Sequence, residues 1–357
     1  MAFTTIDDPE SFFQVKLYTG DASTTQAQTL DGTTDMQPDM IWIKQRNGTN
    51  NNMLADAVRG ANNKFNTNTN AGNDTGTTSL KAFSSDGFSV GSNTEAGASS
   101  NYAAYCWKAG TTSGINTTGA DITPSAYSFN QTSGISIIQY TGNSSTDQQI
   151  AHGLGAVPHF IMCKVFDADN PQNWDVYHHK NTSAPETDYL NLNDNGATAD
   201  SVSRWQDTAP TSVLFTVGDA GAVNQTGDTI MGYLFSEKRG FSRFGSFVGN
   251  GSNDGPFLWC GFKPAWFMSK RSDAAASWNV WNHKSNPHNV SDKLHYADGG
   301  DAENTTAQAT YAIDFLSNGI KMRGYRADTN TSGAVHIWAA FAEAPFVNSN
   351  GVPCNAR

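Results

Sequence analysis

A threefold internal repeat constrains the fold of this chain more than any other feature of its sequence. Each copy contains an apolar run that begins with Pro and ends with Lys, and the Pro-to-Lys spacing is six residues each time. These runs are PDMIWIK at 38–44, PHFIMCK at 158–164 and PAWFMSK at 264–270. A pattern that returns at a domain-sized interval predicts structural units with the same local design.

Four further landmarks accompany each Pro-led run in a fixed order. A short segment ending in Gly comes before it, and a short segment with aromatic residues in two copies, a hairpin-like stretch and an apolar closing segment come after it. They lie at 17–20, 139–142 and 246–249; at 52–58, 174–180 and 278–284; at 83–91, 213–218 and 315–323; and at 102–107, 230–235 and 336–341. Five landmarks in one order, found in three copies, predict three similar modules.

The spacing of the copies predicts the boundaries of these modules. Pro38 and Pro158 are 120 residues apart, whereas Pro158 and Pro264 are 106 apart. The excess falls in a Gly-, Ser- and Thr-rich segment with little charge, which is typical of a linker. We therefore expect repeats of about 105 residues, arranged as an N-terminal arm (1–12), a first module (13–110), a linker (111–133), a second module (134–240), a third module (241–346) and a C-terminal tail (347–357).

The residue pattern inside each copy is typical of β-structure. Within the first Pro-led run, Ile41 and Ile43 face one side of an extended strand while Met40 and Trp42 face the other, so the strand should be buried between two layers. Asp-Gly at 86–87 and Asn-Gly at 318–319 favour two-residue hairpin turns. We expect an all-β fold of three tandem β-sandwich modules, of jelly-roll or lectin-like type.

Composition excludes several classes of partner and location. Lys and Arg total 22 against 33 acids, and a net charge of −11 argues against nucleic acid as a partner. No apolar run approaches the ~20 residues that span a bilayer, so we expect no membrane insertion. Acids at positions 7, 8 and 10 argue against a secretory signal. The four cysteines, which form no CxxC pair, should behave as small core residues.

The histidines and acids give little support for catalysis. His178 and His179 beside Asp175 suggest a metal site, but the other copies lack the same set, and neighbours on a strand point to opposite faces. We therefore expect exposed strand histidines, no metal and no cofactor. Candidate hydrolase acids do not recur between copies, so we expect a protein without catalytic residues; these acids are Asp167, Asp169, Asp298, Asp301 and Glu303.

A binding role is easier to support, because exposed aromatic rings beside polar groups recognise carbohydrate. Tyr177, Trp281 and the loop pair Arg204–Trp205 are the candidate ligand-facing residues, and Trp174 is a weaker one. Matched aromatics at strand spacing can instead belong to the core, and Trp205 can lie against the sandwich. Phe12 and Phe13 form a candidate docking arm, unless they simply begin the first strand.

The blocks MAFTTIDDPESFFQVKLYTG, DMQPDMIWIKQR, ADAVRG, LKAFSSDGFSVG and NYAAYCWKAG, with WQDTAPTSVLFTVG, FVGNGSNDGPF, YAIDFLSNGIKMRG and AFAEAPFVNSNGVPCNAR, span nearly the whole chain. Together they resemble a family of repeat-built virion proteins of tailed phages that infect marine and freshwater bacteria, cyanophages among them. Ala55, where the other copies have an aromatic residue, and Cys354 depart from the pattern. The resemblance implies a tail-fibre-like or virion structural protein and supplies no catalytic residues.

The resemblance and the residue pattern together predict a non-enzymatic structural protein on the virion exterior. We expect a component of a tail fibre or fibre-like appendage that acts in host attachment after synthesis in the host cytoplasm. The expected partners are other virion proteins, further copies of the chain in a homo-oligomer, with a trimer favoured, and a host-surface glycan. A capsid-decorating or cementing protein on the head is the alternative, and a polysaccharide-degrading tailspike is a less favoured one.

Overall fold

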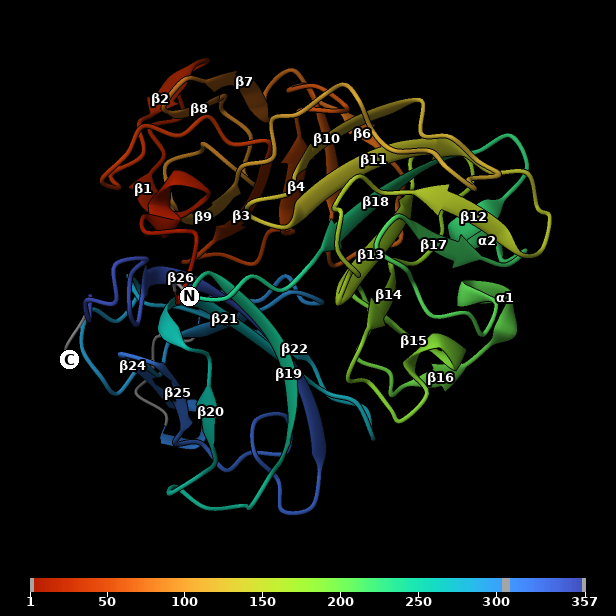
Figure 1. The fold of residues 1–357 in the computed structure, drawn as a ribbon. Helices are drawn as coiled ribbons and strands as arrows, with labels where there is room; N and C mark the ends of the chain where they lie inside the picture. The colour runs from red at the N-terminus through yellow and green to blue at the C-terminus, as the bar shows by residue number, and fades with distance from the viewer. Residues whose placement is uncertain (1–2, 304–308, 355–357) are drawn as a thin grey trace.

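The computed structural model describes residues 3–303 and 309–354, and its fold is all-β, as the sequence predicts. Within these described residues the strands form three large sheets and three small ones, and each large sheet packs against one small sheet to form what we call sheet pairs 1, 2 and 3. Figure 1 shows the pairs as three lobes around a common centre. In the described part of the chain, no helix is long and apolar enough to cross a membrane.

Sheet pair 1 contains the N-terminal strands. Its large sheet has the order β1 (Phe13–Thr19), β9 (Asn101–Trp107), β3 (Met40–Gln45), β4 (Met53–Asp56), β5 (Asn63–Asn66) and β6 (Asp74–Thr75). Its small sheet has the order β2 (Gln26–Gln28), β8 (Gly87–Val90) and β7 (Leu80–Ser84).

Sheet pair 2 contains the middle of the chain. Its large sheet has the order β10 (Ala126–Asn130), β11 (Ile135–Thr141), β18 (Thr229–Phe235), β13 (Phe160–Val165), β14 (Asp175–His178), β15 (Asp188–Asn191) and β16 (Ala199–Asp200). Its small sheet pairs β12 (Gln148–Ala151) with β17 (Leu214–Val217).

Sheet pair 3 contains the C-terminal strands. Its large sheet has the order β19 (Ser242–Val248), β26 (Val335–Pro345), β21 (Phe262–Arg271), β22 (Trp278–Asn282) and β23 (Leu294–Tyr296). Its small sheet has the order β20 (Phe257–Trp259), β25 (Gly319–Met322) and β24 (Ile313–Leu316). The helical segments are single turns: η1 (Pro9–Ser11), η2 (Pro185–Thr187), α1 (Val202–Trp205), α2 (Gly221–Asn224) and η3 (Ala309–Tyr311).

The three large sheets share one strand order. In each, the opening strand lies beside the closing strand, which pairs with the Pro-led strand, which pairs with the next strand in the sequence. The matching sets are β1-β9-β3-β4, β11-β18-β13-β14 and β19-β26-β21-β22. The Asp-Gly and Asn-Gly turns join β7 to β8 and β24 to β25, where the sequence predicts hairpins.

One segment differs from its predicted role. Within 111–133, predicted as a linker, residues 126–130 form β10, an edge strand that pairs with β11. Phe129 is buried, and its main chain also bridges to Thr111. Residues 111–121 are largely exposed loop, as expected of a linker. The segment then continues into β10, where burial of Phe129 removes apolar surface from water.

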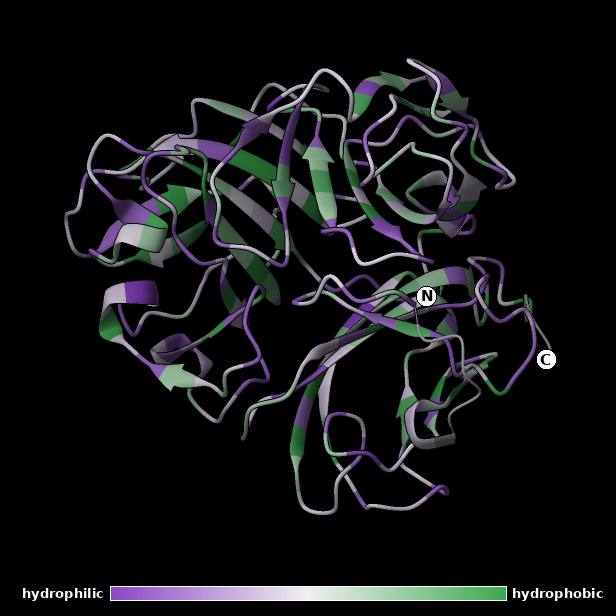
Figure 2. Cartoon of the chain, turned by 180° about the vertical axis from the view of Figure 1, so that it is seen from behind, coloured by the Kyte–Doolittle hydropathy of each residue, from purple (hydrophilic) through white to green (hydrophobic). Residues whose placement is uncertain are grey.

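Each Pro-led strand is buried on both faces, as predicted for residues 40–43. Ile41 and Ile43 pack toward the small sheet with Phe88, whereas Met40 and Trp42 face the other way. Hydrophobic segments accordingly concentrate in the strands, while many connecting loops are hydrophilic (Figure 2). The second face of each large sheet therefore needs another apolar partner.

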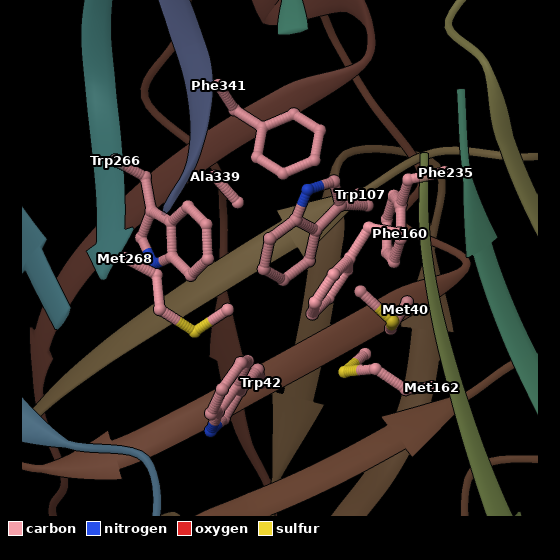
Figure 3. A pocket seen from close by; sticks show the side chains of 10 residues that line it. All are labelled: Met40, Trp42, Trp107, Phe160, Met162, Phe235, Trp266, Met268, Ala339 and Phe341. Carbon is pink, nitrogen blue, oxygen red and sulfur yellow. The ribbon is translucent and has the colours of Figure 1, made fainter. Parts of the chain in front are cut away.

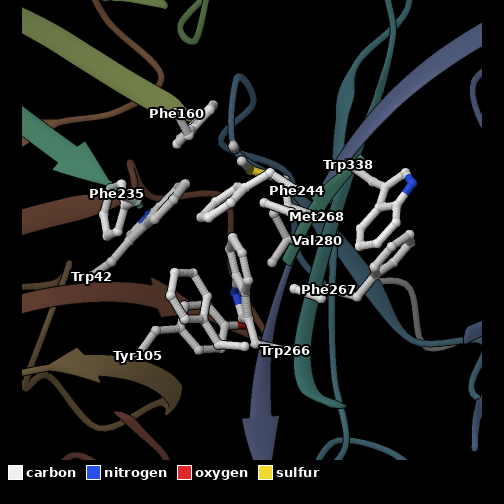
Figure 4. Close-up of a cluster of buried hydrophobic side chains, with 14 of the residues drawn as sticks. Trp42, Tyr105, Phe160, Phe235, Phe244, Trp266, Phe267, Met268, Val280 and Trp338 are labelled. Carbon is white, nitrogen blue, oxygen red and sulfur yellow. The ribbon is translucent and has the colours of Figure 1, made fainter. Parts of the chain in front are cut away.

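That partner is a core shared by all three sheet pairs. The last aromatic residues of the closing strands meet there: the ring centroids of Trp107 and Phe235 are 6.5 Å apart, those of Phe235 and Phe341 are 5.7 Å apart, and those of Trp107 and Phe341 are 5.6 Å apart. Rings of the Pro-led strands join them (Figure 4). The sheet pairs are consecutive in sequence, but they close around one centre.

Candidate functional sites

The lysine that ends each Pro-led run is completely buried, with an exposed fraction of 0% for Lys44, Lys164 and Lys270. Each ammonium donates hydrogen bonds to main-chain carbonyls, and one of these belongs to a different sheet pair. Lys44 reaches Gly300 at 2.7 Å, Lys164 reaches Asn70 at 2.7 Å, and Lys270 reaches Asn195 at 3.4 Å. Pair 1 thus binds pair 3, pair 2 binds pair 1, and pair 3 binds pair 2.

Burial lowers the pKa of all three lysines, because a charged ammonium is poorly solvated there. The pKa falls to about 8 for Lys44 and Lys270, and to about 7 for Lys164. The carbonyl oxygens around each ammonium replace part of the lost hydration. These lysines therefore act as junctions between sheet pairs.

A second repeated position makes the same circuit. Asn52 donates from Nδ2 to the carbonyl of Tyr296 at 2.8 Å, joining pair 1 to pair 3. At the corresponding places the indoles of Trp174 and Trp278 donate to Asn66 at 3.0 Å and to Asn191 at 2.8 Å. Trp174 is thus a buried junction residue, as the core alternative for matched aromatics predicts, and it does not face a ligand.

A third repeated position also links the sheet pairs, but in the reverse order: pair 1 contacts pair 2, pair 2 contacts pair 3, and pair 3 contacts pair 1. The Tyr233 hydroxyl donates to Asp56 at 2.7 Å, joining pair 2 to pair 1. At the positions that correspond to Asp56, His178 Nε2 donates to the carbonyl of Trp338 at 3.1 Å, and Asn282 Nδ2 donates to the hydroxyl of Tyr105 at 3.3 Å. The polar residues at repeated positions therefore hold the three pairs together.

The histidine pair is structural. His178 is buried, so its prediction as an exposed strand residue is wrong; it is held neutral, because Nδ1 accepts from the Lys180 main chain at 3.1 Å while Nε2 donates. Burial lowers the pKa of His178 to about 3. His179 Nε2 donates to the carbonyl of Phe244 at 3.0 Å. Among the described residues, no group of three His, Cys, Asp or Glu side chains is placed to hold a metal ion.

The prediction that Tyr177, Trp205 and Trp281 face a ligand is wrong. Their exposed fractions are 4%, 2% and 0%. Tyr177 and Trp205 pack edge to face, 6.1 Å apart, inside pair 2. The ring centroids of Trp281 and Phe267 are 5.7 Å apart in pair 3. Aromatic rings on the sandwich side of a large sheet fill the space to the small sheet, which is why chemical type alone misplaces them.

Arg204 is partly exposed but engaged. Its Nε lies 2.5 Å from the buried carboxylate of Asp175, and its guanidinium lies 4.6 Å from the ring centroid of Tyr189. Burial raises the pKa of Asp175 to about 6, and the neighbouring arginine counteracts that rise. Arg204 therefore compensates a buried acid.

Phe13 does not belong to an exposed docking arm but begins the first strand, as the alternative predicts, whereas Phe12 precedes that strand. Phe13 begins β1, is 1% exposed, and lies 5.0 Å from Trp107 and 5.3 Å from Phe341. Phe12 is half-buried and packs edge to face on Phe241. Residues 1–2 of the arm and 355–357 of the tail lie outside the described residues. In the described part of the arm and tail, the Asp7 carboxylate accepts a hydrogen bond from the main-chain N–H of Ser349 at 2.6 Å, which joins the arm to the tail.

The cysteines behave largely as predicted. Cys106, Cys163 and Cys260 are buried and free, whereas Cys354 is exposed. Burial raises the pKa of the Cys163 thiol to about 12, so this thiol is unreactive.

The unrepeated acids mostly serve local structure. Asp167 accepts from the Thr229 main chain at 2.6 Å, Glu303 pairs with Arg46 at 2.7 Å, and Asp298 accepts from the Trp278 main chain at 2.9 Å.

Asp298 and Asp301 line one acidic pocket between pairs 2 and 3. Burial raises the pKa of Asp298 to about 6. A second polar pocket lies at the same boundary, lined by Lys180, Asn181, Thr182, Ser183, Ala197, Thr198, Ser246, Ser272, Asp273 and Val335.

The shared core encloses a small cavity (Figure 3). Its free volume is about 10 Å³, room for about one water molecule. The lining side chains come from all three pairs and are apolar except for indole nitrogens: Met40, Trp42, Trp107, Phe160, Met162, Phe235, Trp266, Met268, Ala339 and Phe341. The cavity is too small for an organic ligand and is part of the core.

A larger pocket of about 420 Å³ opens between pairs 2 and 3, and we call it the Trp259 pocket. Trp259 is 46% exposed, and the Arg243 guanidinium lies 4.5 Å from its ring centroid. Arg243 lies 3.7 Å from Glu237, whose pKa burial raises. The complete lining is His159, Glu237, Arg239, Ser242, Arg243, Trp259 and Cys260.

Sequence reasoning missed Trp259 because it looked for chemistry at positions that recur. Phe257 and Trp259 alternate with the buried Leu258 on edge strand β20, which is the pattern of a half-exposed strand. The corresponding strands β2 and β12 read QAQ and QQIA. An aromatic pair in one copy alone was the signal available in the sequence.

Comparison with known protein families finds a match over most of the chain. The family described as a domain of unknown function, DUF7483, matches residues 8–345 of the 357-residue chain. No curated protein and no solved structure matches the chain. Because the match spans nearly the whole sequence, the chain belongs to the DUF7483 family.

Proposed function

We propose that the protein is a non-enzymatic structural component of a phage virion, and that it forms part of a tail fibre or fibre-like appendage that adheres to the host surface. The circuit of buried hydrogen bonds at Lys44, Lys164 and Lys270 is the observation that carries the structural part of this proposal. The repeat keeps residues that bond the sheet pairs to one another, and it keeps no acid–base set in all three copies. The virion setting rests on the sequence resemblance.

Adhesion by such a scaffold uses many weak contacts. A homo-oligomer, for which a trimer is favoured, presents several copies of one binding surface, and its avidity exceeds the affinity of a single site. Other virion proteins hold the oligomer in place, and a host-surface glycan is the proposed ligand. The oligomeric state is measured directly by light scattering on the purified chain, where a mass of one chain would remove the trimer from the proposal.

Competition for adsorption tests the adhesive role. Purified protein, folded and oligomeric, is expected to bind host cells and to slow adsorption of the phage in a dose-dependent way. Heat-unfolded protein at the same concentration is the control. Absence of binding with unchanged adsorption would contradict adhesion and leave a purely structural role.

Position in the virion separates the tail from the head. Antibody labelling in electron micrographs is expected to mark the tail or its appendages. Label confined to the head would favour the alternative, a capsid-decorating or cementing protein. A degrading tailspike predicts release of oligosaccharide from host polysaccharide, whereas the present proposal predicts none.

A further inference from the structure

The Trp259 pocket is the surface feature that the repeat does not explain. Side chains at the repeated positions described above are buried in the junctions between sheet pairs or in the sandwich cores, whereas Trp259 is exposed on an edge strand beside an open hollow. The pocket volume of about 420 Å³ falls within the range of pockets that hold small ligands. It lies where sheet pairs 2 and 3 meet.

The Trp259 ring is held in place before any ligand arrives. Arg243 lies over the ring, with 4.5 Å between the guanidinium carbon and the ring centroid. Gly261 has a φ of +79°, and a Cβ atom there would come within 3.0 Å of Trp259 Cη2 and Cζ2. The missing side chain therefore makes room for the ring. A fixed aromatic ring with exposed surface suits the apolar C–H face of a sugar, since little conformational freedom is lost on binding.

The charges beside the ring favour an anion. Arg239 and Arg243 line the pocket together with a single acid, Glu237, in a chain whose net charge is −11. Arg243 is only loosely paired with Glu237, at 3.7 Å. In the described part of the chain no ion pair occupies Arg239, whose guanidinium lies 5.6 Å from the ring centroid of Phe3. Two arginine forks present planar N–H donors that match a carboxylate.

His159, a further polar residue of the lining, supplies a neutral donor. His159 Nδ1 accepts from the Glu237 main chain at 3.0 Å, which leaves the proton on Nε2. Burial lowers the pKa of His159 to about 4, so the ring stays uncharged near neutral pH. An imidazole N–H of this kind suits a hydroxyl oxygen.

We propose that the Trp259 pocket binds a saccharide that carries a carboxylate, with the sugar face on Trp259 and the carboxylate on Arg239 and Arg243. A uronic-acid unit of a surface polysaccharide has this chemistry. The inference deepens the proposed adhesion and rests on it for the source of the ligand. Its test uses purified saccharides, so its outcome is independent of the adsorption experiment.

Calorimetric titration of the full chain tests the proposal, with trimers of galacturonic acid and of glucuronic acid as probes and a galactose trimer as the neutral comparison. We expect at least one acidic trimer to bind about tenfold more tightly than the neutral one. Trp259→Ala should weaken that binding by about tenfold or more. Arg243→Gln should remove most of the preference for the acidic trimer.

Phe257→Ala is the matched control, because Phe257 is exposed on the same face of the same strand but does not line the pocket. It should change the affinity less than about twofold, and a thermal melt of each variant checks that it is folded. Equal binding of acidic and neutral trimers, equal losses in Trp259→Ala and Phe257→Ala, or no binding of either acidic trimer up to about 10 mM would overturn the saccharide site. Failure here with successful competition for adsorption would leave the adhesive role standing at another surface.

Discussion

The ammonium group of Lys44 donates a hydrogen bond to the main-chain carbonyl of Gly300, 256 residues further along the chain, at 2.7 Å. Two equivalent bonds start from Lys164 and Lys270, so three sheet pairs are tied in a closed circuit. A single protein chain thereby builds an approximately threefold arrangement around one core. Removing one link should weaken the whole molecule.

Lys44→Ala is expected to lower the free energy of unfolding by about 2–3 kcal/mol, because it leaves a cavity and unpaired buried carbonyls at Gly300 and Asn50. Lys44→Met should fall between this variant and the wild type, since it restores packing of the stem but not the hydrogen bonds. Urea titration measures both.

The matched control is Lys81→Met, because the ammonium of Lys81 bonds to Thr77 within its own sheet pair at an exposed place. It should stay within about 0.5 kcal/mol of the wild type. Equal effects at the two lysines would contradict a junction role for Lys44.

Because His178 is buried as a neutral imidazole, we expect the free energy of unfolding to depend on pH in the acid range. Burial lowers its pKa to about 3, below the ordinary value of 6.5, so the unfolded chain binds more protons than the folded one between these values. The stability that this residue contributes is therefore present above pH 6.5 and is lost as the pH falls. The expected loss from this one group is about 2–3 kcal/mol between pH 6.5 and pH 4.

His178→Asn tests this directly, because Asn282 stands at the corresponding place in pair 3. The variant should have a shallower fall in stability across that range, measured by urea titration at each pH. If the His178→Asn slope matched the wild type, the buried neutral imidazole would be refuted.

Limited proteolysis should cut the chain first between residues 112 and 119, which form exposed loop ahead of β10. Because both fragments contribute to the shared core, we expect them to elute together in gel filtration and to separate only in denaturant. Separation of the fragments under native conditions would contradict the shared core.

Much of the local structure follows from the sequence, because it depends on neighbours. Alternation of Met40, Ile41 and Trp42 predicts a strand buried on both faces, and Asp-Gly at 86–87 predicts a hairpin turn; both occur. The order of strands within each large sheet also agrees with the repeated landmarks. The proposed domain boundaries stay a prediction.

Closure of the three pairs could not be predicted in the same way. A bond such as that from Lys44 to Gly300 depends on distant segments, and no local pattern encodes it. The same reason explains the misplaced site residues: Tyr177 and Trp281 have the chemistry of sugar-binding rings, but their repeated positions point into the sandwich cores. Trp259, which breaks the repeat, is a ring that reaches the surface.

Scanning calorimetry of the intact chain tests the central structural claim, that three repeated sheet pairs share one core, most directly. We predict one transition whose calorimetric enthalpy equals its van't Hoff enthalpy, and we predict that Lys44→Ala moves that whole transition to lower temperature. Separate transitions for the sheet pairs, or a shift confined to one of several transitions in Lys44→Ala, would contradict the account.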